Sequence, residues 1–172
     1  MTDILDEIIA HKRLEIEQQK AAISQELLIN NCNEPMPRRS MRASLSASPS
    51  GIIAEFKRRS PSKGWIKENA QADIISPAYE MAGASVLSIL TDENFFGGNL
   101  KDIRAARPQV SLPILRKDFI IDEYQLYQAR VMGADAVLLI AACLTPEQCL
   151  MFAELALSLI HISEPTRLLS IS

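Results

Sequence analysis

The stretch LPILRKDFIIDEYQLYQARVMGADAVLLIAACL, residues 112–144, holds the pattern that decides the fold. A strand-like segment at 113–119, PILRKDF, is followed by apolar residues at helical spacing over 123–132 and by an apolar run at 136–142. Strand, helix and strand in this order are typical of a βαβ unit, whose two strands are parallel. We therefore predict a parallel sheet covered by helices.

The same alternation extends to both sides of this stretch. Apolar runs predict strands at 52–56 and 85–90, and helical spacing predicts helices over 72–82 and 100–106. A last helix begins at Thr145, where Thr-Pro-Glu-Gln can form a capping box. Four strand–helix units predict an α/β fold. Two architectures fit: an open doubly wound sheet, whose GxGxxG fingerprint is absent after the first strand, or half of a (β/α)8 barrel, since a complete barrel needs about 250 residues.

The first 50 residues differ from the rest of the chain. Residues 3–21 predict an amphipathic helix, with one apolar face made of Ile4, Leu5, Ile8, Ile9 and Leu14. Residues 30–50 collect Asn, Pro, Arg and Ser, which predicts a connection without a regular element of any length. We expect residues 1–50 to form an N-terminal helix and connection, and residues 51–156 to form the sheet and its helices.

Composition narrows the class of protein. The chain has 172 residues, 48% of them hydrophobic and 23% charged, with a net charge of −3, which is typical of a globular domain. A mild acidic bias gives no broad attraction to nucleic acid or to a membrane surface, and we expect neither as a partner. The first residues, MTDILDEIIAHKRLE, do not resemble a signal peptide, so the expected compartment is the cytoplasm. Three cysteines without CxxC spacing predict free thiols.

Charged residues gather where the predicted strands end. Glu55 lies near the end of the first strand, Lys57 and the run at 58–63 follow it, and Lys117 lies at the end of the third. The carboxyl ends of parallel strands form the ligand-binding face of α/β folds. Glu55 and Lys57 point to the same side of their strand, and burying them is costly unless they form a site or pair with each other. For the run at 58–63, a solvated loop is the simpler interpretation.

Three segments resemble the first half of the indole-3-glycerol phosphate synthases of tryptophan biosynthesis: IIAEFKRRSPSKGWI at 52–66, SVLSILTDENFFGGNL at 85–100, and the stretch at 112–144. This resemblance implies a (β/α)8 barrel preceded by an N-terminal extension that lies over the active-site end. It also implies a lyase that converts 1-(2-carboxyphenylamino)-1-deoxyribulose 5-phosphate to indole-3-glycerol phosphate, with loss of CO2 and water. The family uses no metal or organic cofactor.

The resemblance assigns roles to individual residues. Lys117 matches the general acid that protonates the substrate carbonyl oxygen, Lys57 matches a second active-site lysine, and Glu55 matches the glutamate that orients it. The positions that match substrate-binding residues are Ser60, Phe96, Phe119 and Leu138. For Phe96, Phe119 and Leu138, packing in the core is an alternative interpretation. Asp118 is either part of the site or an anchor for loops.

The end of the chain departs from the family pattern. Residues 157–172 read LSLIHISEPTRLLSIS, and residues 157–167 back-translate to the read-through of a transposon-based sequencing-library adapter. We expect the family sequence to stop near Ala156 and the remaining residues to be a non-native tail. The fifth-strand glutamate and the phosphate-binding loops of the family are then missing, so we expect the chain to be inactive as written.

Two other functions stay open on the sequence alone. One is another phosphate-sugar barrel enzyme, such as phosphoribosylanthranilate isomerase, although the EFKRRSPS and LRKDF motifs favour the synthase. The other is a half-barrel without catalytic activity that acts as an interaction module. Because members of this family are often fused to the isomerase, a fused domain in a longer parent protein is also left open.

Overall fold

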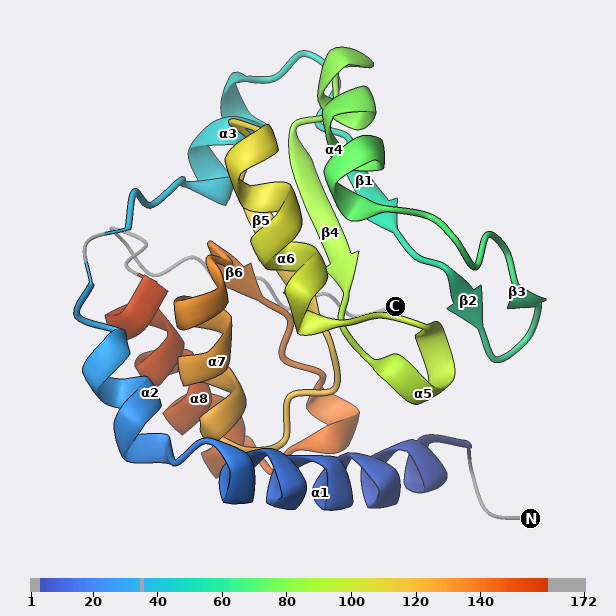
Figure 1. The fold of residues 1–172 in the computed structure, drawn as a ribbon. Helices are drawn as coiled ribbons and strands as arrows, with labels where there is room; N and C mark the ends of the chain where they lie inside the picture. Colours follow the sequence, from blue (N-terminus) through green and yellow to red (C-terminus); the bar gives the residue numbers. More distant parts are fainter. Residues whose placement is uncertain (1–3, 35, 161–172) are drawn as a thin grey trace.

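A computed structural model describes residues 4–34 and 36–160 (Figure 1). Four parallel strands form one sheet in the order β1 (Ile53–Phe56), β4 (Val86–Leu90), β5 (Ile114–Lys117) and β6 (Ala136–Val137). The strands follow one another in space as they do in sequence. A doubly wound sheet reverses its strand order at a switch point, whereas a barrel does not. The predicted α/β fold is therefore confirmed, with the strand order of the first half of a (β/α)8 barrel.

The helices that alternate with these strands agree closely with the sequence prediction. They are α4 (Ala72–Met81), α6 (Leu100–Ala106) with the 3-10 turn η1 (Arg107–Gln109), α7 (Tyr124–Met132) and α8 (Pro146–Ile160). The capping box at the start of α8 is present, because the Gln148 N–H donates to Thr145 Oγ1 at 3.2 Å and the Thr145 N–H donates to Gln148 Oε1 at 3.0 Å. Figure 1 shows α4, α6 and α7 on one face of the sheet.

The main core lies between the sheet and this helical layer. Every residue of β4 is buried, because β1 and β5 cover its two edges and helices cover one face. The largest apolar side chains of the main core come from strands β1, β4 and β5 and from helix α6. They are Phe56, Leu87, Ile89, Ile103 and Ile114. A smaller apolar cluster joins the N-terminal helices to α7 through Ile16, Leu28 and Tyr124. The core therefore holds the strands on the side of the sheet that the helices cover, and it leaves the carboxyl ends of the strands for the site.

The predicted N-terminal helix is present as α1 (Ile4–Ala22), but its buried face is only partly as predicted. Ile4 and Leu14 are 50% and 59% exposed, while the buried positions are Ile8, Lys12 and Ile16. The reason is the surface beneath the helix. Figure 1 shows α1 lying across the ends of the strands. There Lys12 meets the carboxylates of Asp92 and Asp118 rather than an apolar sheet face.

The prediction that residues 30–50 lack regular structure is wrong. Helix α2 (Gln25–Asn31) extends into this segment, and α3 (Met41–Ala47) lies within it. Ser40, one of the serines that suggested a loop, is the N-cap of α3, since its Oγ accepts the Ala43 N–H at 3.1 Å. Ser24 caps α2 in the same way, its Oγ accepting the Leu27 N–H at 3.3 Å. A side-chain oxygen at this position satisfies an otherwise unpaired amide of the first turn.

The fourth predicted strand is also shorter than expected. The sequence predicts a strand over 136–142, whereas β6 has two residues and a 3-10 turn, η2 (Ala141–Cys143), follows it. In the described part of the chain β6 pairs with β5 alone, so nothing extends its ladder on the other side. Pairing across space, which the local pattern does not report, sets the length of such a strand.

Three further short elements, all near the strand ends, were also not predicted. They are the antiparallel pair β2 (Arg59–Ser60) and β3 (Gly64–Trp65) and the one-turn helix α5 (Glu93–Phe96). The expected boundary at residue 156 falls inside α8, and residues 161–172 of the expected tail lie outside the described residues, so these boundaries stay predictions. Of the helices that the structure describes, none has the length and apolarity to cross a membrane.

Candidate functional site

Glu55, Lys57 and Lys117 meet at the carboxyl end of the sheet. Glu55 Oε1 lies 2.8 Å from Lys57 Nζ, and Glu55 Oε2 lies 2.5 Å from Lys117 Nζ. Lys117 comes from β5, two strands away from Glu55 on β1, with β4 between them. The parallel register brings residues 62 positions apart into one cluster. The structure thus joins the three side chains that the sequence marked as catalytic candidates.

The two lysines control the charge of Glu55. Burial raises the pKa of the Glu55 carboxyl, but hydrogen bonds and charge from Lys117 and Lys57 outweigh burial and hold the pKa below its usual value. Glu55 is therefore a carboxylate at neutral pH. Since each of its oxygens contacts a different ammonium group, it can orient both lysines.

The two candidate aromatic residues lie side by side. Phe96 is on α5 after β4, Phe119 follows β5, and their ring centroids are 6.1 Å apart with planes inclined by 36°. Offset pairs of this kind can form the wall of an apolar subsite. Because Phe119 is two residues beyond Lys117, this wall begins next to the charged cluster.

The remaining two candidates have mainly structural contacts here. Ser60 is buried on β2, and its Oγ accepts the Lys63 N–H at 3.2 Å, which holds the turn between β2 and β3. Leu138 follows β6, is half-buried, and donates its N–H to the Arg116 carbonyl at 3.3 Å. Their assignment to substrate binding stays a prediction.

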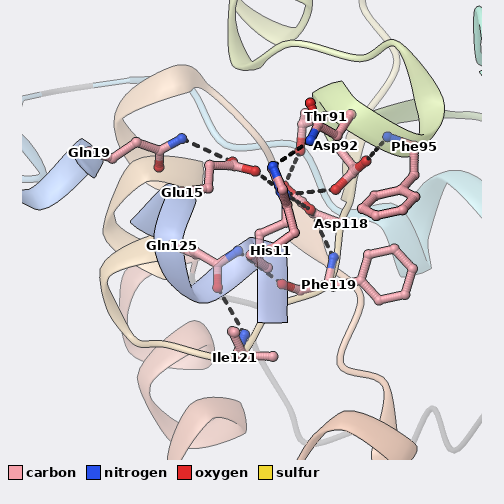
Figure 2. Close-up of polar contacts among 12 residues, drawn as sticks. His11, Glu15, Gln19, Thr91, Asp92, Phe95, Asp118, Phe119, Ile121 and Gln125 are labelled. Atoms are coloured by element: carbon pink, nitrogen blue, oxygen red, sulfur yellow. Dashed lines mark hydrogen bonds and ion pairs between the residues drawn. The ribbon is translucent and has the colours of Figure 1, made fainter. Parts of the chain in front are cut away.

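A buried cluster of charges that sequence reasoning missed lies beneath α1. Lys12 is fully buried, and its Nζ lies 2.8 Å from Asp92 Oδ2, 3.1 Å from Asp118 Oδ1 and 2.8 Å from Glu15 Oε2. Figure 2 shows the Asp92 and Asp118 side chains close together. Burial alone would lower the pKa of Lys12, but the carboxylates of Asp118, Asp92 and Glu15 raise it above its usual value. This lysine is therefore a permanent buried cation.

Asp118 connects this cluster to the strand that carries Lys117. Its Oδ2 accepts the Thr91 hydroxyl at 2.6 Å and the Arg116 guanidinium at 2.9 Å, and its Oδ1 accepts the Phe119 N–H at 2.8 Å (Figure 2). Burial raises the pKa of Asp118, but the charges of Arg116 and Lys12 outweigh it and hold the pKa below its usual value. Of the two interpretations left open by the sequence, these contacts make Asp118 an anchor for loops.

Arg58 corrects the interpretation of the run at 58–63 as a solvated loop. Its guanidinium donates to both oxygens of Asp102, at 2.6 and 2.7 Å, and to the Gly97 carbonyl at 3.0 Å. The bidentate geometry ties the segment after β1 to α6 and to the end of α5. The sequence signal for this role was weak, because an arginine in a basic run has no periodicity that marks it as buried.

Comparison with known proteins agrees with this geometry. The family model described as indole-3-glycerol phosphate synthase matches residues 5–160. Proteins of that name from Bacteroides thetaiotaomicron and Neisseria meningitidis serogroup B are 66% and 50% identical to this chain over 156 and 160 residues, each match covering 91% of the chain. The chain spans 60% and 62% of the length of these two curated relatives. By sequence, strand order and the lysine–glutamate cluster, the chain belongs to the indole-3-glycerol phosphate synthase family.

Proposed function

We propose that this chain supplies the lysine and glutamate groups of an indole-3-glycerol phosphate synthase. That enzyme converts 1-(2-carboxyphenylamino)-1-deoxyribulose 5-phosphate to indole-3-glycerol phosphate, with loss of CO2 and water. The observation that carries the proposal is the Glu55 carboxylate between two ammonium groups at the carboxyl ends of β1 and β5. The names of the relatives support the same reaction.

Each residue of the cluster has a task in this reaction. Lys117 donates a proton to the substrate carbonyl oxygen, which makes the carbonyl carbon electrophilic for attack by the aromatic ring and prepares that oxygen to leave as water. Lys57 attracts the anionic groups of the substrate, and Glu55 holds both lysines in place. The ring carbon that carries the carboxylate forms the new C–C bond, and loss of CO2 from that carbon restores aromaticity. A second protonation of the former carbonyl oxygen and loss of a proton from the adjacent CH2 carbon then release water.

The neutral residues complete the proposed substrate site. The Phe96 and Phe119 rings flank the carboxyphenyl ring, while Leu138 and Ser60 bind nearby parts of the substrate. The proposed partner is thus a phosphorylated small molecule rather than nucleic acid, and the proposed location is the cytoplasm. A fused isomerase domain in the parent protein remains compatible with this site.

The same proposal includes a requirement for more chain than these 172 residues. Enzymes with this fold bind phosphate through loops that follow the last two barrel strands, whereas the strands described here are the first four. Without a phosphate anchor the carbonyl group is not held within reach of Lys117, and positioning contributes much of catalysis. We therefore propose that the chain alone is inactive.

A hybrid barrel tests the proposal. It joins residues 1–156 to the part of the Bacteroides thetaiotaomicron relative that follows the matched stretch. We expect the purified hybrid to form indole-3-glycerol phosphate, and the chain alone and the hybrid with Lys117→Met to form none. A folded hybrid without turnover would contradict the proposed function. Turnover of phosphoribosylanthranilate in its place would favour the isomerase.

A further inference from the structure

One buried residue of α1 contacts the two loops that carry Phe96 and Phe119. Lys12 Nζ lies 2.8 Å from Asp92, whose other oxygen accepts the Phe95 N–H at 2.8 Å and so caps α5, the helix that bears Phe96. The same ammonium lies 3.1 Å from Asp118, which accepts the Phe119 N–H. The loop that carries each phenyl ring is therefore held by a carboxylate that forms an ion pair with Lys12.

Lys117 is fixed by other contacts. Its backbone pairs with β4 at Leu90, and its ammonium group lies on Glu55. Neither contact involves Lys12. A change at Lys12 should therefore move the aromatic wall and leave the proposed general acid in place.

Stability alone does not explain a charge at this position. Apolar residues of similar volume often replace buried ion pairs without loss of stability, so an apolar side chain here could attach α1 equally well. A second link between α1 and the sheet layer, Lys20 with Asp122, has side chains 37% and 31% exposed, and such surface pairs contribute little. What Lys12 supplies and an apolar residue cannot is a fixed geometry for two carboxylates at once.

We propose that Lys12 is a positioning residue that sets the spacing of the Phe96 and Phe119 rings, and thereby the affinity of the site for the aromatic part of its substrate. The kinetic part of this proposal rests on the proposed function. Its structural part, the control of two loops by one buried cation, does not.

Steady-state kinetics of the hybrid barrel test the first part. For Lys12→Met we expect KM to rise about tenfold with kcat changed by less than about twofold, because the two phenyl rings flank the carboxyphenyl ring both before and during its attack on the carbonyl, so their contacts contribute to both states. Lys12→Arg should restore most of the affinity, since it keeps a cation between the carboxylates. The matched control is Lys20→Met on the same helix, which should leave KM unchanged.

Loss of folded protein gives a different result. It lowers the apparent kcat and leaves KM as it was, and that outcome would overturn the proposal, as would unchanged values of both. If Lys12→Met does not fold, the double variant Lys12→Met/Asp92→Asn removes one uncompensated charge while the amide oxygen of Asn can still cap α5. The same rise in KM is expected of it.

Amide exchange in the 172-residue chain itself tests the second part without any turnover. In Lys12→Met the protection of the Phe95 and Phe119 amides against hydrogen exchange should fall about tenfold. The protection of the Leu87 amide in β4 should stay the same. Equal losses at all three amides, or none, would refute the role of Lys12. An inactive hybrid with the expected exchange pattern would reject the proposed function and retain the positioning role.

Discussion

Arg116→Met should be among the most destabilising single changes in this chain. Arg116 is fully buried, pairs with Asp118 at 2.9 Å and donates to the Gln125 carbonyl at 2.7 Å. Removing one partner of a buried pair costs about 3–5 kcal/mol, and Lys12 beside Asp118 favours the lower end of that range. The Gln125 carbonyl lies within α7, where the helical ladder gives it a second partner, so loss of this hydrogen bond adds little. We expect the free energy of unfolding to fall by about 3–4 kcal/mol.

Urea unfolding of the hybrid barrel, followed by circular dichroism, measures this loss. The midpoint should fall while the dependence on urea concentration stays the same. Arg104→Met on the exposed surface of α6 is the matched control and should change stability by less than about 0.5 kcal/mol. Adding Asp118→Asn to Arg116→Met should cost less than the sum of the single losses, because the two side chains interact. A loss below about 1 kcal/mol would refute the assignment of Arg116 as a structural cation.

Three further predictions concern catalysis, acid stability and packing. In the hybrid, Lys117→Met should lower kcat by a factor of about 10²–10⁴ while circular dichroism stays unchanged, and near-normal turnover would exclude Lys117 as the general acid. The pKa of Asp118 is lowered in the folded state because Arg116 and Lys12 outweigh burial, so its contribution is complete above its unfolded pKa of about 3.9 and is lost as pH falls below that value. Asp118→Asn should therefore flatten the decline of unfolding free energy below about pH 4, and an unchanged slope would contradict this. Ile89→Ala, at a fully buried position of β4, should cost about 2–5 kcal/mol in urea unfolding, and a loss under about 1 kcal/mol would show that β4 is not the centre of the core.

The elements that the sequence predicted well carry their own boundary signals. Helix α6 has the predicted bounds because Asn99 caps its first turn and Pro108 follows its end. The elements predicted badly depend on distant partners. Ser40 begins a helix rather than a loop because α3 is held to the sheet, for instance by the Ser44 hydroxyl donating to the Ser85 carbonyl at 2.6 Å. No local pattern reports such a contact.

The residues of the site also fall into two groups, those that the sequence predicted and those that it did not. Glu55, Lys57 and Lys117 could be found because a charge at the end of an apolar strand is unusual. Lys12 could not be found by the same reasoning, since a lysine on an amphipathic helix is normally assigned to the solvent side. A signal was present: Lys12 is four residues from Ile8 and four from Ile16, midway along the buried face. A charged residue in such a stripe predicts a carboxylate on the surface that the helix covers.

Of the three consecutive charged residues 116–118, Arg116 and Asp118 pair with each other while Lys117 between them has a different partner, because side chains alternate across a strand. Arg116 turns toward the helices and contacts α7, while Lys117 turns the other way and meets Glu55. The pairing of Ile89 with Arg116 in β4 and β5 fixes which residue faces which side. A slip of one residue would place the arginine in the site and the lysine in the helical layer. The position of the proposed general acid therefore depends first on strand register, and the buried cations Arg116 and Lys12 act on the loop that follows.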